Sequence, residues 1–483
     1  MALIALIVAP LIAAVLCWIP QLRKSAWYVT VLFQCVEFVL SLRICSKVIT
    51  SGRVVGLPGW LEADGLGALV LLVVSFVCGI AAIYSVGYMK HDQEQRPRLW
   101  WFYSNYHLLV FALLVVPALA DPNLVWVGVE LITLFSVLLV GFENTRGALE
   151  AAWKFSVLTI MGAPIALLGF LILFWAYRSG AGVQHETWES LRLAAPLMSP
   201  ALLRLSFLLV FVGFGAKAGL APMHTWLPDA HSQAPTPVCA VLSGVKTTVP
   251  LYVILRFLGI LLASPQARMG RWMVVIGLIS VAIAAFLLLQ VRDYKRMFAY
   301  STVEHMGIIL AAAGLATQTS DLGAVSQLLN HSITKSLCFY VAGIVLLAMN
   351  TREIKSVRGL LRISPFAGVT LVFCSLAIAG APPFPIFLSE FSILSSGIRA
   401  GHFVAVGILA ILIVIAFVGI IMHVNRMVFG RPEHEAALIS SELPLSCRLG
   451  VLLAAIPVVV FGVYVPAPIY HLLQLAAGQL GGR

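Results

Sequence analysis

Residues 218–229 read A-G-L-A-P-M-H-T-W-L-P-D, and residues 379–390 read A-G-A-P-P-F-P-I-F-L-S-E. Both stretches fit the pattern A-G-x-x-P-x-x-x-aromatic-Leu-x-acid, and both lie within long apolar runs. A proline inside a helix removes one backbone donor and clashes with the carbonyl four residues back. We therefore predict two broken helices in matching positions, interrupted at Pro222 in the first and at Pro382 and Pro383 in the second.

The repeat extends into the neighbouring apolar segments. Asp229 and Glu390 end the two motifs at corresponding positions, and Lys154 and Lys335 each lie eight residues before a glycine. The matched segments are five predicted spans apart, and an odd number of crossings makes the second copy start from the opposite side of the membrane. The pattern therefore predicts two inverted five-helix repeats, spans 4–8 and spans 9–13. Interrupted helices in corresponding halves are typical of transport sites near the bilayer midplane.

The composition is that of a membrane protein. Hydrophobic residues make up 61% of the 483 residues, charged residues 11%, and the mean hydropathy is +1.00. A soluble domain would be about a quarter charged, so we predict an all-α integral membrane protein of about fourteen transmembrane helices, the seventh and twelfth of them broken. Apolar runs place the spans near residues 3–20, 27–47, 66–88, 105–120, 122–142, 150–177, 203–227, 235–263, 271–291, 298–317, 322–349, 366–397, 402–428 and 447–466.

These spans suggest four parts. We predict N-terminal helices 1–3 in residues 1–100, the first repeat in 101–264, the second repeat in 265–430 and a C-terminal helix in 431–483. Lys and Arg are more numerous in the loops after odd-numbered spans, which predicts that these loops face the cytoplasm and both termini the outside.

Charge and cysteine usage exclude other classes of protein. The formal net charge is +11, but the basic residues stand singly in short loops, so we expect no nucleic-acid partner. None of the eight cysteines forms C-x-x-C, and most lie in apolar runs, as buried free thiols do. We therefore expect no metal site and no electron-transfer cofactor in this chain.

Ionisable groups within the predicted spans are the candidate functional residues, because a charge at membrane depth costs about 3 kcal/mol or more. A Glu–Lys pair that can separate changes the proton affinity of the lysine, and histidines titrating near neutral pH suit a relay. The predicted proton-transfer residues are Glu130, Lys217, Lys246, His305, His331, Lys335 and Glu390.

Other polar residues have competing interpretations. Lys154, His224 and Asp229 are predicted as supporting residues, although Lys154 could extend to the membrane surface from a helix end. His224 and Asp229 could equally cap the broken helix at a water interface. Glu37 lies outside the repeats and is predicted to contact the periphery or a partner, and Glu304 is predicted to face solvent or lipid headgroups.

Four stretches carry a family resemblance: residues 213–231, 300–307, 328–337 and 380–391. They resemble the antiporter-like subunits of respiratory complex I and of Mrp sodium/proton antiporters. The phrase V-E-H-M-G and the chain length look most like the hydrogenase-4 component F branch, of the formate hydrogenlyase group. The resemblance implies a fourteen-helix fold with two inverted repeats, each holding a half-channel.

The resemblance also implies roles for individual residues. Glu130 matches the glutamate of the fifth helix, and Lys217 matches its lysine partner in the seventh. Lys335 matches the lysine of the eleventh helix, and Glu390 stands where relatives carry Glu or Lys in the twelfth. Lys246 matches a relay lysine of the eighth helix in one of two alignments.

The function that the resemblance implies is proton translocation by a membrane subunit of a redox-driven complex, such as a group 4 hydrogenase, in the cell inner membrane. Its partners would be the lipid bilayer, other membrane subunits and, through them, peripheral iron–sulfur or hydrogenase-type subunits. Three alternatives stay open: a Mrp-type cation/proton antiporter subunit, the membrane partner of an inorganic-carbon uptake complex, and a passive scaffold.

Overall fold

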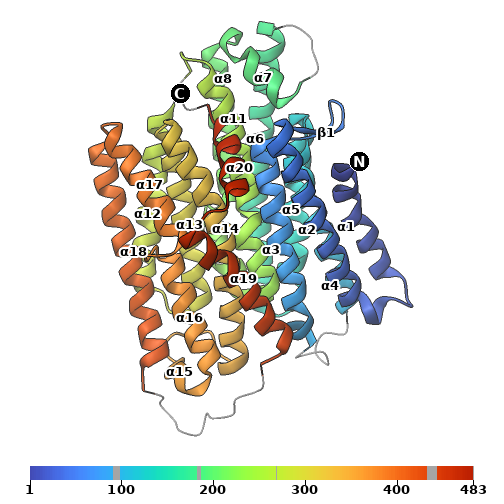
Figure 1. Cartoon of the computed structure of the whole chain (residues 1–483), viewed down its shortest axis with the longest axis vertical. Coiled ribbons are helices and arrows are strands. Elements are labelled where there is room, and N and C mark those ends of the chain that lie inside the picture. The colour runs from blue at the N-terminus through green and yellow to red at the C-terminus, as the bar shows by residue number, and fades with distance from the viewer. Residues whose placement is uncertain (91–97, 182–185, 268, 432–442, 482–483) are drawn as a thin grey trace.

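The computed structural model describes residues 1–90, 98–181, 186–267, 269–431 and 443–481. Its long helices lie side by side along the longest axis of the molecule (Figure 1). α7 (Trp188–Ala194) lies at one end of this axis and α15 (Leu360–Ile363) at the other, and we name the two ends after these helices.

The first half of the chain makes eight crossings. Two of them are interrupted: α8 with α9, and α10 with α11, which are joined by the π-helical turn η4. The elements are α1 (Ala2–Trp18), α2 (Ala26–Ser51), α3 (Gly65–Lys90), α4 (Leu99–Ala118), α5 (Pro122–Val140), α6 (Arg146–Ala181), α8 (Pro200–Ala218), α9 (Trp226–Gln233), α10 (Thr236–Val241), η4 (Leu242–Lys246) and α11 (Thr248–Ala263). An antiparallel hairpin, β1 (Val54–Leu57) with β2 (Leu61–Ala63), joins α2 to α3.

The second half makes six crossings, of which the pair α16 and α17 is interrupted. The helices are α12 (Gly270–Gln290), α13 (Tyr294–Gly314), α14 (Gln318–Met349), α16 (Pro365–Ile378), α17 (Pro385–Arg399), α18 (Phe403–Phe429), α19 (Leu445–Val463) and α20 (Ala467–Gly478). α20 follows the last crossing and packs back against α3 and α14.

Local sequence explains where several helices begin. The Asp121 carboxylate accepts a hydrogen bond from the Asn123 amide at the start of α5, and the Asp293 carboxylate caps α13. Thr317 and Ser320 form a reciprocal capping box at the start of α14. Such side chains satisfy backbone amides that have no partner within the helix, and this fixes the ends of long apolar segments.

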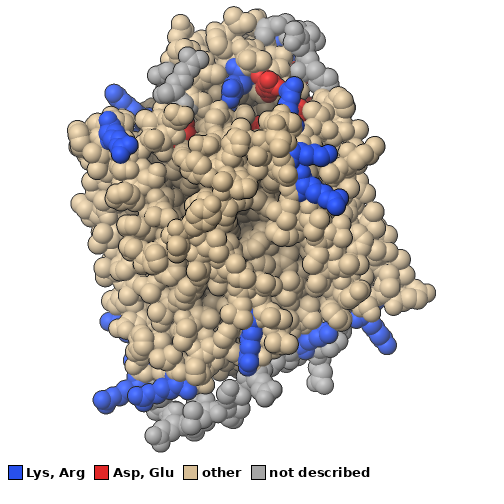
Figure 2. Space-filling model, viewed as in Figure 1, with Lys and Arg blue, Asp and Glu red and all other residues tan. Residues whose placement is uncertain are grey.

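The predicted fold class is confirmed. Within the described residues, eleven helices are long and apolar enough to cross a membrane, and α1, α13 and the α16–α17 pair complete the fourteen predicted crossings. On the face shown in Figure 2, a broad middle band carries no charged side chain, while Lys and Arg lie towards both ends. The chain is a multi-pass membrane protein. The predicted domain boundaries stay predictions.

The two predicted helix breaks lie at matching places. α8 ends at Ala218 and α16 ends at Ile378, and each is followed by a short non-helical stretch before the next helix. Gly219 and Gly380 have φ angles of 81° and 76°, which a residue with a Cβ adopts only at a cost. The predicted prolines lie within these two stretches, each at a cis peptide bond.

Two other features were not predicted from the sequence. The eighth crossing contains the π turn η4, and the chain after the last crossing forms α20. A single π turn inserts one residue into an α-helix, and it often occurs at functional sites. Here it carries Lys246 at its end.

Candidate functional site

Glu130 of α5 and Lys217 of α8 form an ion pair. The Lys217 Nζ lies 3.1 Å from the Glu130 Oε2 and 2.7 Å from the Thr133 Oγ1, to which it also donates. Lys217 is buried, whereas the Glu130 side chain is 23% exposed and its second oxygen is buried without a hydrogen-bond partner among the described residues. The pair therefore lies at the edge of the protein interior, with one acceptor available for water.

Lys246 contacts this pair through the broken helix. Its Nζ donates to the backbone oxygen of Lys217 at 3.1 Å and lies 3.8 Å from the ring centroid of Trp226. The Lys217 oxygen is available because the Ala221 amide, its usual helical donor, bonds to the Ser280 Oγ at 3.1 Å instead. A carbonyl dipole and a ring face stabilise an ammonium less than a carboxylate does, so this buried lysine is suited to exchanging its proton.

Two histidines occupy the centre of the molecule. The His331 Nε2 of α14 donates to the Ser243 backbone oxygen in η4 at 3.3 Å, and its ring centroid lies 5.2 Å from that of His305 in α13. The His305 Nδ1 accepts from the Gln327 Nε2 at 3.1 Å, so its Nε2 carries the hydrogen that is donated to the Ile378 oxygen at 3.1 Å. His305 therefore connects α14 to the second helix break.

Uncharged side chains complete the contacts on either side of the histidines. The Ser243 Oγ lies 2.6 Å from the Thr302 Oγ1, which joins η4 to α13. The Gln327 Oε1 accepts from the Ser389 Oγ, and Gln327 is also a hydrogen-bond partner of the neighbouring Glu390. Sequence reasoning missed these links, because hydroxyl and amide side chains in apolar helices carry no charge that marks them.

Glu390 is buried directly behind the second break. A Cβ on Gly380 would lie 2.5 Å from the Glu390 Oε2, so a larger residue there would displace this carboxylate. The backbone of the break therefore lies directly beside the acid.

Lys335 lies beside, and not within, the series of contacts that runs from Lys217 through the two histidines to Glu390. Its Nζ donates to the Phe298 oxygen at 2.8 Å and to the Ser301 Oγ, both on α13. It also interacts electrostatically with Glu304, one turn further along that helix. In the first repeat the corresponding lysine, Lys154, contacts Asp229, the counterpart of Glu390, at 3.3 Å.

The prediction that Glu304 faces solvent or headgroups is wrong. Its side chain is buried, and one carboxylate oxygen has no hydrogen-bond partner among the described residues. The sequence placed this span near residues 298–317, but the Asp293 cap starts α13 four residues earlier. Glu304 therefore lies at mid-helix, between Lys335 and Glu390, and interacts electrostatically with both.

The prediction for Glu37 is also wrong. Instead of meeting the periphery, Glu37 is fully buried where α2 packs on α3, and it accepts a hydrogen bond from the Gln34 Nε2 at 2.7 Å. Its position outside the repeats gave no signal of which face of α2 it occupies.

His231 is a buried residue that sequence reasoning did not single out. It lies at the end of the quoted stretch 213–231, and neither ring nitrogen has a hydrogen-bond partner among the described residues. Its ring packs on Phe339 at 5.1 Å between centroids and interacts electrostatically with Lys246 and Lys335. It therefore stands between the lysines of the two repeats.

The supporting residues lie towards the α15 end. The Asp229 carboxylate lies 3.3 Å from the Lys154 Nζ and 2.5 Å from the Arg296 Nη2, which joins the two repeats. Lys154 is 42% exposed, and His224 is buried with one ring nitrogen unpartnered in the described part of the chain. Cavities of about 80 Å³ and about 530 Å³ meet at Gln233 and Arg296. Water can thus reach Asp229 from this end.

The chain matches known families over most of its length. The transmembrane model of the NADH:quinone oxidoreductase/Mrp antiporter family matches residues 121–416, and the model for the N-terminus of chain 5 of NADH-ubiquinone oxidoreductase (complex I) matches residues 57–98. The hydrogenase-4 component F homolog of Methylacidiphilum infernorum (isolate V4) is 35% identical over 464 residues, which cover 94% of each chain.

Two solved structures share the fold. A chain of the membrane-bound sulfane sulfur reductase, an archaeal respiratory membrane complex, superposes with a TM-score of 0.88 at 23% identity, covering 99% of this chain and 97% of that one. A chain of the Mrp complex from Dietzia sp. DQ12-45-1b superposes with a TM-score of 0.87 at 18% identity, with the same coverage. The resemblance predicted from the motifs is confirmed, and the chain belongs to the NADH:quinone oxidoreductase/Mrp antiporter family of membrane subunits.

Proposed function

We propose that this chain moves protons through the membrane as one subunit of a redox-driven complex. One observation carries the proposal: polar and ionisable side chains follow one another through the buried interior, from the Glu130–Lys217 pair in the first repeat to Glu390 in the second. Ionisable groups are rare at membrane depth and mark ion or proton pathways.

The contacts divide this line into short steps. The Lys246 ammonium donates to the backbone oxygen of Lys217. Ser243 is three residues before Lys246 on η4, and its backbone oxygen accepts from His331. Beyond His331 the line continues to His305. From His305 it passes through Gln327 and Ser389 to Glu390. Several polar atoms along the line are buried without a hydrogen-bond partner among the described residues, and water molecules would satisfy them.

The Glu130–Lys217 pair is the proposed switch. A nearby carboxylate favours the charged lysine, and desolvation favours the neutral one, so opening the pair releases a proton from Lys217. Lys246 and His231 are placed to receive it, and Lys335, Glu304 and Glu390 form the corresponding group in the second repeat. Lys335 and Glu304 do not form a close ion pair like that of Glu130 and Lys217. This difference supports a role for the second group as the acceptor of the proton.

The partners follow from the same proposal. Glu130 is partly exposed on α5, where Val127, Leu134 and Leu138 are exposed too, so a neighbouring membrane subunit can cover the pair. The relative named as a hydrogenase-4 component favours peripheral iron–sulfur or hydrogenase-type subunits as the source of energy. The complex would lie in the inner (cytoplasmic) membrane, with the α15 end towards the cytoplasm.

The alternatives make different predictions in the same assay. A Mrp-type antiporter would exchange sodium for protons without electron flow, and the likeness to a Mrp complex keeps this candidate. The membrane partner of an inorganic-carbon uptake complex would conduct protons without sodium exchange and without electron flow. A passive scaffold would conduct none.

The test is Glu130→Gln in the assembled complex, in inside-out vesicles that receive an electron donor and acceptor. Proton uptake into the vesicles should be lost while subunit composition and electron transfer in detergent stay normal. Glu186→Gln is the matched control, because Glu186 is a buried acid paired with Arg178 at 2.8 Å away from the line, and it should pump normally. Normal pumping by Glu130→Gln would refute the proposal.

A further inference from the structure

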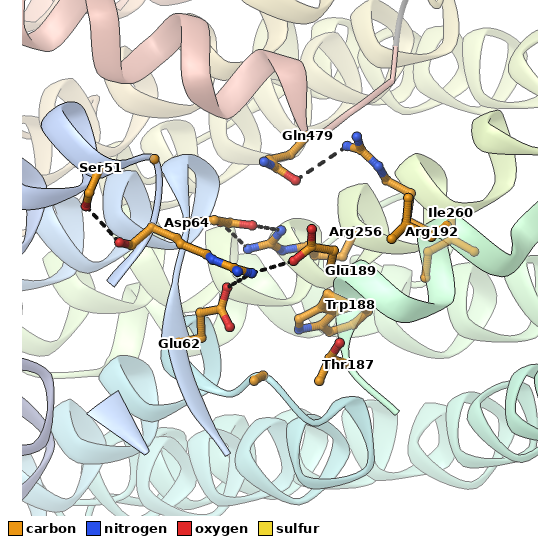
Figure 3. A pocket seen from close by; sticks show the side chains of 14 residues that line it. Ser51, Glu62, Asp64, Thr187, Trp188, Glu189, Arg192, Arg256, Ile260 and Gln479 are labelled. Atoms are coloured by element: carbon orange, nitrogen blue, oxygen red, sulfur yellow. Dashed lines mark hydrogen bonds and ion pairs between the residues drawn. The ribbon is translucent and has the colours of Figure 1, made fainter. Parts of the chain in front are cut away.

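A polar cavity of about 300 Å³ lies at the α7 end, apart from the line between the two repeats (Figure 3). Its walls come from the β1–β2 hairpin, α7, α11 and the end of α20. Among its lining residues, Arg53 bridges Glu62 at 3.5 Å and Glu189 at 2.6 Å, and Arg192 donates to the Gly478 oxygen at 3.2 Å. Long-range contacts among four parts of the chain therefore build this cavity.

Asp64 and Arg256 separate the cavity from the buried interior. The Arg256 Nη1 and Nη2 each lie 2.5 Å from one Asp64 oxygen, and both residues line the cavity (Figure 3). On its inner side the Arg256 Nε donates to the Tyr252 Oη at 3.0 Å, and Tyr252 is fully buried. Burial alone would raise the pKa of the Asp64 carboxyl, but the Arg256 charge and hydrogen bonds bring that pKa below its ordinary value. The Asp64 carboxylate therefore stays charged at neutral pH.

One face of α11 leads inward from this pair. Thr248, Tyr252 and Arg256 follow at four-residue spacing and so share a face over about 12 Å. All three are buried, and the Thr248 Oγ1 lies 3.2 Å from the Ser332 Oγ of α14. Ser332 directly follows His331, so this polar face ends at the central line.

We propose that the cavity is the mouth of a second water branch, which follows this face of α11 to the central line, and that the Asp64–Arg256 pair closes it to hydronium ions. The inference rests on the proposed function, since closing the branch matters only if the line carries protons. A guanidinium does not release its proton in proteins, and a fixed positive charge in a pore repels cations. The pair would thus stop protons from returning through the first repeat.

The test measures whether water-borne reagents reach the inner end of the branch. The chain stays in its native complex, in vesicles that expose the α7 end, with the exposed natural cysteine removed by Cys35→Ser. Leu193→Cys probes the cavity rim, Thr248→Cys the inner end, and Ile254→Cys the opposite face of α11. A membrane-impermeant methanethiosulfonate is added, and the labelled fraction is measured by mass spectrometry.

Each probe is placed in the natural chain and in the double variant Asp64→Asn/Arg256→Gln. Both charges are removed together, because removing one would leave the other buried and unpaired. With the pair intact, only position 193 should react. In the double variant position 248 should react as well, position 254 should stay protected, and passive proton leak into the vesicles should rise several-fold.

Three outcomes would overturn the inference. No reaction at position 193 would mean that the cavity is closed to water. Reaction at 193 but none at 248 in the double variant would make the pair a structural clamp, and equal reaction at 248 and 254 would mean that α11 has loosened as a whole. If the expected labelling appears but Glu130→Gln pumps normally, the water branch stands and the proposed function fails.

Discussion

The Lys246 ammonium donates a hydrogen bond to the backbone oxygen of Lys217 over 3.1 Å. The second repeat has the same relationship, since the His305 Nε2 donates to the Ile378 oxygen over 3.1 Å. Lys217 and Ile378 each stand five residues before the aligned proline of their repeat, Pro222 or Pro383. At each helix break a backbone oxygen therefore accepts a hydrogen bond from a buried side chain of the proposed proton path.

This relationship predicts the effect of Pro222→Ala. An alanine restores an amide hydrogen that can bond to the Ala218 oxygen and allows α8 to continue, so the Ala221 amide can leave Ser280 and replace Lys246 as the donor to the Lys217 oxygen. The loss of one hydrogen bond from a charged donor, worth about 1.5–3 kcal/mol, should slow proton transport about tenfold or more in vesicles. Pro10→Ala removes a proline within α1, outside both repeats, and should leave transport unchanged. Equal rates for both variants would contradict the role given to the break.

Lys246→Arg separates a proton carrier from a structural cation. Arginine keeps the positive charge and can still lie over the Trp226 ring, but it does not deprotonate in proteins. The complex should therefore assemble normally and lose proton transport, as measured by vesicle acidification. Lys295→Arg is the control, because Lys295 is also buried and donates to a backbone oxygen, that of Ala234, at 3.4 Å. Full transport by Lys246→Arg would assign that lysine a purely structural role.

The fold could be predicted because its two strongest signals are local. Apolar runs of about 20 residues mark the crossings, and the twofold motif around Pro222 and Pro383 marks the breaks and the inverted repeat. The π turn at η4 could not be predicted, because it depends on how α10 and η4 itself pack against α14. α20 was missed because twelve residues are too few to register as a crossing.

The site could be predicted only where it carries charge. Glu130 and Lys217 were recognised from their depth in apolar spans and lie in contact, and Lys246 lies beside them. Ser243 and Gln327 were missed, because a hydroxyl or an amide is common in membrane helices and satisfies itself on the nearby backbone. The error at Glu304 came from the uncertain start of one helix, since a shift of four residues turns a surface acid into a buried one.

Glu304→Gln and Glu390→Gln test whether the two buried acids act in one step. Each acid lies in the field of the other, and Glu304 also interacts with Lys335, so removing one charge changes the proton affinity of the rest. Each single variant should lower proton transport, and the double variant should be no slower than the slower single one. A double variant that multiplies the two losses would show that the acids act independently.

The Asp64–Arg256 pair predicts a stability effect that does not depend on proton transport. Breaking a buried ion pair costs about 3–5 kcal/mol, so Asp64→Asn should lower the Tm of the purified complex clearly. Because the pKa of Asp64 is lowered in the folded protein, the stabilisation is fully present above the ordinary pKa and is lost only as the pH falls through the lower folded value. The Tm difference between the natural chain and the variant should thus stay constant from about pH 8 to about pH 5 and shrink in stronger acid. Arg53→Gln breaks a pair with Glu189 in which the two side chains are 54% and 63% exposed, so its cost should be about 0–1 kcal/mol. A Tm difference for Asp64→Asn that vanishes between pH 8 and pH 5 would show that this carboxylate is not held charged by Arg256.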